Sequence, residues 1–418
     1  MNTKQLLIAS ATIAAVTVSF AGELERPTGF KVGERLTLRP YVSLSYTYDS
    51  NVDSSRHGKT GSQWSVEPGV AADYIGDNWK VDGRVWYQYH AYNRYTHQLN
   101  SSSYGEQLGI TWSDSLPNEK GWSFKASERY SQIAQDDDMS NSDGRGQGRD
   151  RQEFSAQGVL ERRLNQNVHL AADLSYYFLD YENNVKKYAA MYGWERFTLG
   201  GEVGYMASRW TDFILASNYQ WYSQDNNRLR AQSGLYDGQT AKGKKISKDS
   251  RGWTVMGGIA TRATERIEYR LLGGYSRFDY GSGAKTLDGF TYQTSARWAI
   301  EDRLSLMMLA SSYFQPSENS YGTANKVYNF SIGLAKAWVR GKLTSNIDFN
   351  YRKETVQYAE YTSDEYDRDI WTGRIGFTYN VNRYVSLFSN LEYQSTDSDR
   401  KSYQYDRWRG TVGMRLSY

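Results

Sequence analysis

The sequence predicts an all-β protein: a transmembrane, up-and-down antiparallel β-barrel of about eighteen strands, within a range of roughly sixteen to twenty. Three observations support this fold class. Apolar and polar residues alternate along many short segments, short and long connections alternate between those segments, and the composition is polar yet rich in aromatic residues. A helix would instead need apolar residues with a period near 3.6, which these segments lack.

The final segment of the sequence shows the alternation well. One face carries Trp408, Gly410, Val412, Met414, Leu416 and Tyr418, and the other carries Arg409, Thr411, Gly413, Arg415 and Ser417. The first face suits lipid and the second suits water, which is the pattern of a strand in a membrane barrel. The same alternation recurs upstream, for example over 167–181, 266–279 and 342–354.

Segments of this kind predict the strand positions. We expect strands near 37–48, 63–75, 79–93, 104–115, 121–133, 150–164, 167–181, 194–207, 211–223, 251–263, 266–279, 288–299, 303–315, 325–338, 342–354, 366–380, 383–395 and 404–418. Tight connections such as 165–166 alternate with long ones such as 224–250. Outer-membrane barrels place tight turns in the periplasm and long loops outside the cell. We therefore expect the first barrel strand to begin, and the last one to end, on the periplasmic side.

Composition excludes several other classes of protein. The chain has no cysteine, so it is not a disulfide scaffold, and its 15% aromatic content is too high for a disordered chain. Mean hydropathy is −0.74, and no apolar run after residue 21 is long enough for a membrane helix. A net charge of +3 is too small to indicate nucleic acid as a partner.

The first residues have the pattern of a secretory signal. Lys4 precedes an apolar stretch, and small residues at Ser19 and Ala21 favour cleavage after Ala21. We therefore expect a signal peptide over 1–21, a short periplasmic segment over 22–36 and the barrel over 37–418. An uncleaved anchor is the alternative.

A short motif follows the first expected strand. Tyr46, Tyr48, Asp49 and Asn51 stand in the run Tyr-Thr-Tyr-Asp-Ser-Asn-Val. This resembles the Tyr-x-Asp-x-Asn hairpin of the outer-membrane β-barrel porin family, whose members include outer-membrane proteins of exopolysaccharide operons. The resemblance implies the outer membrane of a Gram-negative-type bacterium. The alternative interpretation is structural: Asp49 and Asn51 cap the end of the strand.

The end of the sequence carries a second resemblance. Val412–Tyr418 is similar to the C-terminal signal that the barrel-assembly machinery recognises. Phenylalanine is the commonest last residue of that signal, and Tyr418 departs from it. The resemblance implies that machinery as a partner, beside outer-membrane lipid and lipopolysaccharide.

Charged residues are expected to line the lumen. They are Lys80, Asp82, Arg84, Glu161, Arg163, Arg270, Asp348 and Arg352. So many charges on the inner face favour a hydrated lumen, because burying them without water or partners would be costly. The alternative is that they pair across strands and only stiffen the wall.

Two loops and a set of aromatic residues add further expectations. A basic loop carries Arg228, Arg230, Lys242, Lys244, Lys245 and Lys248. Inside the pore it would favour anions or acidic sugars, and outside it could meet lipopolysaccharide phosphates or surface glycan. An acidic loop over 136–150 has enough carboxylates for a calcium ion but lacks the EF-hand spacing, so we expect a flexible acidic loop and no metal. Aromatic girdles are expected at Trp64, Tyr74, Trp79, Tyr92, Trp122, Tyr130, Tyr384 and Tyr393.

No motif indicates catalysis. The sequence has four histidines, no Gly-x-Ser-x-Gly elbow and no His-Glu-x-x-His, so we expect neither an enzyme nor a cofactor. The leading hypothesis is a porin-like passive channel for small polar solutes. One alternative is a barrel serving exopolysaccharide export or surface retention, with polysaccharide as a partner. Another is a structural or adhesive barrel that acts through its loops. The sequence does not indicate an oligomeric state.

Overall fold

The computed structural model describes residues 29–52, 54, 56, 58–93, 101–114, 121–133, 151–181, 194–224, 249–280, 286–316, 322–339, 342–358, 366–399, 401 and 404–418. Within these ranges it contains one sheet of nineteen antiparallel strands. Their order along the chain is β1 (Phe30–Val32), β2 (Leu36–Asp49), β3 (Gly61–Ile75), β4 (Trp79–Tyr92), β5 (Ser101–Ser113), β6 (Gly121–Ile133), β7 (Arg151–Arg163), β8 (Val168–Tyr181), β9 (Trp194–Met206) and β10 (Thr211–Gln224). The second half comprises β11 (Ser250–Arg262), β12 (Ile267–Tyr280), β13 (Leu287–Glu301), β14 (Leu304–Pro316), β15 (Gly322–Ala337), β16 (Leu343–Tyr358), β17 (Tyr366–Asn380), β18 (Val385–Ser398) and β19 (Tyr405–Ser417).

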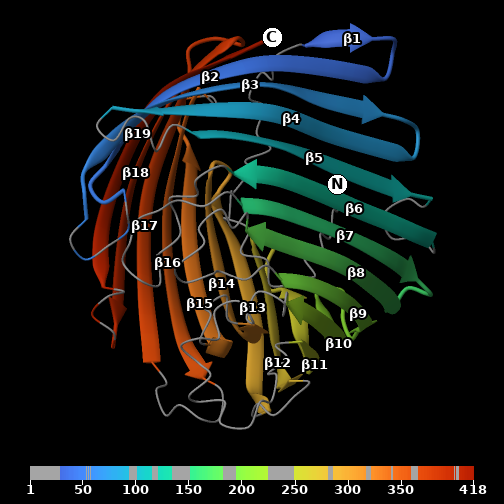
Figure 1. Ribbon diagram of the computed structural model, residues 1–418. Coiled ribbons are helices and arrows are strands. Elements are labelled where there is room, and N and C mark those ends of the chain that lie inside the picture. Colours follow the sequence, from blue (N-terminus) through green and yellow to red (C-terminus); the bar gives the residue numbers. More distant parts are fainter. Residues whose placement is uncertain are drawn as a thin grey trace.

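The sheet closes on itself where β19 pairs with β2. The pairing runs from Arg409 opposite Asp49 to Ser417 opposite Tyr41. Figure 1 shows the red β19 beside the blue β2, with the other strands following in sequence order around the wall. Strands β2 to β19 therefore form a closed antiparallel barrel of eighteen strands, which confirms the predicted fold. Closure leaves no open sheet edge in the hydrocarbon, where unpaired backbone groups are very costly.

The three-residue strand β1 lies outside this closed wall. It pairs with the start of β2, and Phe30 stacks on Tyr418 with ring centroids 4.4 Å apart. Gly29 and Gly33 flank β1 with φ near +65°, a backbone conformation that suits glycine. This part of the expected 22–36 segment therefore contacts both the first barrel strand, β2, and the last residue, Tyr418. The expected signal peptide, residues 1–21, falls outside the described residues.

The pattern of side-chain exposure along the strands is the reverse of that in a soluble protein: apolar side chains are exposed and many polar ones are buried. In β9 the outward Leu199 is 50% exposed, whereas the inward Thr198 and Glu202 are buried. The outward surface is apolar because it faces lipid, and the polar residues turn to the interior. Among the described residues, no helix is long and apolar enough to span a membrane.

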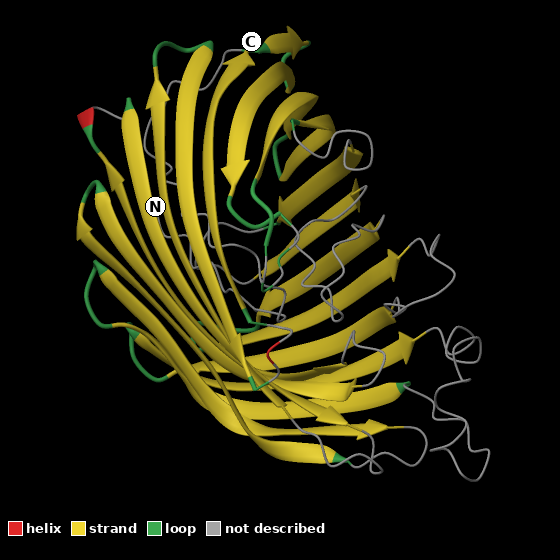
Figure 2. Cartoon of the chain, turned by 60° about the vertical axis from the view of Figure 1, so that its left-hand side comes forward, coloured by secondary structure: helices red, strands yellow, loops and turns green. Residues whose placement is uncertain are grey.

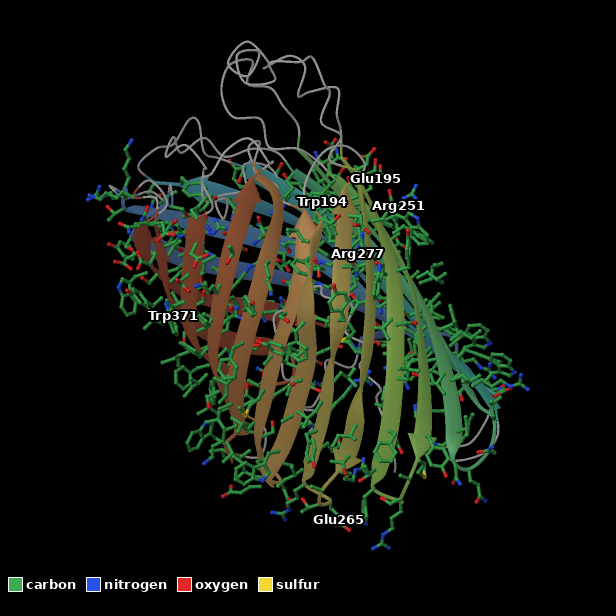
Figure 3. The ribbon with its side chains drawn as sticks, turned by 90° about the horizontal axis from the view of Figure 1, so that it is seen from below. Trp194, Glu195, Arg251, Glu265, Arg277 and Trp371 are labelled. Carbon is green, nitrogen blue, oxygen red and sulfur yellow. The ribbon has the colours of Figure 1, made fainter. Side chains whose placement is uncertain are left out.

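Four of the described tight turns share one construction. Side-chain oxygens of Asn165, Ser208, Thr264 and Asn382 each accept hydrogen bonds from the backbone amides two and three residues ahead. Asn, Ser and Thr favour turns through such bonds. Figure 2 shows these turns, in green, gathered mainly along one rim. In Figure 3, Glu265 marks that rim at the bottom, and Trp194 lies near the opposite rim.

Aromatic residues lie on the outer surface near both rims, as expected for Trp64, Trp79 and Trp122, which are exposed. The expectation for Tyr92 is wrong: its side chain is buried and belongs to the inner face. Tyr92 is thirteen positions after the outward Trp79, and an odd separation along a strand turns the side chain to the opposite face.

The two faces should respond differently to a new charge. We expect Leu199→Arg, on the lipid face, to destabilise the folded barrel by about 2–4 kcal/mol, the range for arginine near the bilayer midplane. The matched control is Ser127→Arg, because Ser127 is an exposed residue at the middle of β6 that points to the interior. Urea unfolding in lipid vesicles, followed by the gel-mobility shift of unheated samples, measures both. Equal destabilisation by the two variants would contradict the assignment of the faces.

Candidate functional site: the inner wall of the barrel

Strand β4 shows how the wall presents charge to the interior. Lys80, Asp82 and Arg84 occupy every second position and point inward, whereas Val85 and Tyr87 point outward. Cross-strand pairing shows which residues of β3 and β5 lie on the same inner face. Lys80 and Asp82 remain exposed although they point inward. The structure thus places these three residues on the lumenal surface.

The other residues expected to line the lumen also lie on the inner face, but several are held within the wall. Arg270 bonds Glu202 at 2.5 Å, with both side chains largely buried. Arg352 pairs with the buried Glu354, which Arg368 also contacts at 2.5 Å. These arginines therefore stiffen the wall, and only parts of them reach water.

Glu161, Arg163 and Asp348 complete that set. Glu161 accepts a hydrogen bond from Ser123 Oγ at 3.2 Å. Asp348 accepts one from Asn346 Nδ2 at 2.6 Å. Arg163, half-buried, faces the same side of β7 as Glu161. Cross-strand pairing therefore accounts for part of the inner charges, whereas Lys80 and Asp82 remain exposed on the same wall.

The inner wall has an open side and a packed side. On β4 to β6 the inward Lys80, Asp82, Gln107, Ser127 and Arg129 are exposed. On β8 to β12 the inward residues are mostly buried. Examples are Asp173, Arg196, Glu202, Ile214 and Leu272. Near the rim opposite the tight turns, the packed side carries an apolar cluster of Leu179, Trp194, Tyr222, Phe278, Leu287 and Phe314. The inward side chains are therefore most exposed along the side formed by β4 to β6.

The open side and the neighbouring closure of the barrel carry an excess of positive charge. Among the residues that the structure describes, the basic ones on the inner faces of β19 and β2 to β6 are Arg39, Lys80, Arg84, Lys125, Arg129, Arg407, Arg409 and Arg415, and the acidic ones are Asp49, Glu67, Asp73 and Asp82. Most of the basic residues are arginines, which keep their charge at any physiological pH.

A row of alternating charges crosses five strands at the closure. Cross-strand register sets Asp348, Arg374, Glu392, Arg409 and Asp49 opposite one another in turn. Arg374 Nε donates to Glu392 at 2.8 Å, and Arg409 lies 3.5 Å from Asp49. Opposite charges on directly paired positions stabilise a sheet and help to fix its register.

The family-like hairpin motif takes part in this closure. Asp49 Oδ2 accepts hydrogen bonds from Arg407 Nε at 2.9 Å and Nη2 at 2.5 Å, and its Oδ1 accepts one from the backbone amide of Asn51. Asn51 Nδ2 donates to the backbone oxygen of Asp406. The ring of Tyr46 packs at a tilt against the ring of Trp64 on the outer surface, and Tyr48 is exposed there. The motif therefore ties the first strand of the barrel to the last, beyond the capping role that the sequence suggested.

Sequence reasoning missed Arg407, Glu354 and Arg368 as members of the wall. Alternation alone could have placed Arg407 and Arg368 inward, but their partners lie on other strands and depend on register. The basic-loop residues Arg228, Arg230, Lys242, Lys244, Lys245 and Lys248, and the acidic loop, fall outside the described ranges. Within those ranges, no three His, Asp or Glu side chains are grouped to hold a metal ion.

A closed barrel with an apolar outside and a charged inside defines an outer-membrane β-barrel protein. Residues 211–418 match the model of the family described as "Putative beta-barrel porin 2", and residues 36–192 match the model of the family described as "Putative MetA-pathway of phenol degradation". The two matches together support an outer-membrane β-barrel porin family for this chain, and the protein is located in the outer membrane.

Solved structures with a similar fold are distant in sequence. The ferric enterobactin receptor PfeA of Pseudomonas aeruginosa, as a mutant, is 8% identical, with a TM-score of 0.47 over 91% of this chain and 80% of that one. The outer membrane protein opdK of the same species is 11% identical, with a TM-score of 0.44 over 91% and 99% of the two chains. No curated protein matches the sequence significantly.

The contact between Asp49 and Arg407 should contribute strongly to stability. Arg407 is 3% exposed, so Arg407→Gln leaves Asp49 without its main partner, and we expect a loss of about 3–5 kcal/mol in the free energy of unfolding. The control is Arg374→Gln, because Arg374 is 42% exposed and its loss should cost less. Urea unfolding in vesicles measures both variants and the double variant Asp49→Asn/Arg407→Gln. Similar losses for the two single variants would refute this role for Arg407.

Proposed function

We propose that this barrel is a passive channel for small polar solutes. The observation that carries the proposal is the open side of the inner wall, where Lys80, Asp82, Gln107 and Arg129 point inward and still remain exposed. Charged side chains hold such positions only when water or a partner solvates them. A water-filled interior is the simplest environment that meets this need.

The size of the barrel supports the same proposal. Barrels of about sixteen to eighteen strands enclose more space than side chains can fill and typically leave an aqueous channel. The eighteen strands of this wall fall in that range. The ion pairs of the packed side, such as Arg270 with Glu202, would keep the wall in shape while solutes pass along the open side.

Planar-bilayer recording tests the proposal. Purified full-length protein should insert and give discrete steps of conductance in potassium chloride, because ions would cross the lumen with the water. Heat-denatured protein from the same preparation is the control and should give no steps. The absence of steps over many insertions of folded protein, verified by its heat-modifiable gel mobility, would overturn the proposal.

A further inference from the structure

Arginines and aromatic rings alternate along the inner wall from the closure of the barrel at β19 and β2 to the open side. Arg415 lies over the ring of Tyr41 at 4.8 Å, and Arg84 lies 5.0 Å from the ring centroids of both Tyr41 and Trp86. Arg129 follows at 6.0 Å from the ring of Trp86. The series Arg415, Tyr41, Arg84, Trp86 and Arg129, which we call the arginine–aromatic series, comes from strands β19, β2, β4 and β6.

Two glycines allow the rings to lie along the wall. A Cβ atom at Gly69 would lie 2.4 Å from the ring of Tyr41, and one at Gly105 would lie 2.4 Å from the ring of Trp86. A larger residue at either position would push the ring away from the wall. The two rings therefore lie close to the backbone of the neighbouring strands. The guanidinium groups of Arg84 and Arg415 lie against the ring of Tyr41, whose own side chain is buried.

One carboxylate holds the two guanidinium groups beside each other. Glu67 pairs with Arg84 and lies 3.7 Å from Arg415 Nη2, and it also accepts a hydrogen bond from Tyr41 Oη at 3.1 Å. Its side chain is 17% exposed, whereas those of Arg84 and Arg415 are 36% and 42% exposed. The side chains of Arg84 and Arg415 are thus more exposed to the interior than the side chain of Glu67, whose single carboxylate lies between them.

Stacked guanidinium groups keep donors available at their edges. An arginine has five N–H donors, and its planar group can stack on a ring while its edge binds a carboxylate. Arg84 uses Nε on Tyr41 Oη and Nη2 on Glu67, and Arg415 uses Nε on Ser43 Oγ. These contacts leave both arginines with further N–H groups and fix their positions before any ligand arrives.

The geometry points to a binding site for small organic anions that carry carboxylate groups, formed by Arg84 and Arg415 on the inner wall. The site lies where the inner face has eight basic against four acidic residues. It refines the proposed channel function by naming the class of solute, and it rests on that function for its physiological meaning. Binding itself does not require that the barrel conduct.

Titration calorimetry tests the site with succinate, whose two carboxylates can meet two guanidinium groups, on full-length protein in detergent at low salt. We expect succinate to bind the unaltered protein and its neutral analogue succinamide not to bind. Arg84→Gln/Arg415→Gln should weaken succinate binding by at least about tenfold, because it removes two guanidinium groups that would form charge-assisted hydrogen bonds with the carboxylates. Glu67→Gln keeps a side-chain oxygen that can accept hydrogen bonds from the guanidinium groups but removes the competing negative charge, so succinate should bind more tightly.

The control is Arg162→Gln/Arg277→Gln, which removes two exposed arginines from the outer face. It should bind succinate like the unaltered protein. Equal weakening in the two double variants, or no binding by the unaltered protein, would overturn the site. Heat-modifiable gel mobility verifies that each variant is folded.

The channel and the site can fail separately. If the unaltered protein conducts, its reversal potential in a potassium chloride gradient should indicate anion preference, and Arg84→Gln/Arg415→Gln should shift it toward cations. Conductance without succinate binding and without that shift would overturn the site and leave the channel. Succinate binding by a protein that never conducts would overturn the channel and leave the site.

Discussion

Backbone pairing between β2 and β19 is the constraint on which the rest of the structure depends. A sheet in hydrocarbon must leave no unpaired edge, so the first and last barrel strands have to meet in one register. Arg407 donates charge-assisted hydrogen bonds to Asp49 across this contact, and Arg409 forms an ion pair with Asp49 at 3.5 Å. A shift by one residue would turn the arginines toward lipid, which makes the register strongly specified.

The closed wall then separates two solvents that place opposite demands on neighbouring residues. Leu199 faces lipid and Thr198 faces the interior, although they are adjacent in the sequence. The interior is itself uneven. Buried ion pairs such as Arg270 with Glu202 stiffen one side, whereas Arg84 and Arg415 on the other side keep much of their surface open. Solute contact is therefore proposed along one side of the lumen.

The contacts between arginines and aromatic rings on this part of the wall depend on small residues in the neighbouring strands. Tyr41 and Trp86 lie flat because glycine stands at positions 69 and 105 on the neighbouring strands. The rings hold the guanidinium groups, and Glu67 brings two of them together. A site of this kind needs no loop, so it has the rigidity of the sheet on which it is built.

The sequence by itself determined the fold class, the approximate strands and the face of most residues, because a period of two is a local property. It placed Lys80, Asp82 and Arg84 on the inner face. The expectation of an outward Tyr92 was wrong because an odd separation from the outward Trp79 turns its side chain inward. Which inner charges are buried and which are open was decided by the tertiary structure. Glu354 has Arg368 as a partner, and Glu67 lies beside both Arg84 and Arg415, only because register and closure bring distant strands together. Alternation orients a side chain but cannot choose its neighbour across the sheet, since that choice depends on contacts between residues far apart in the chain.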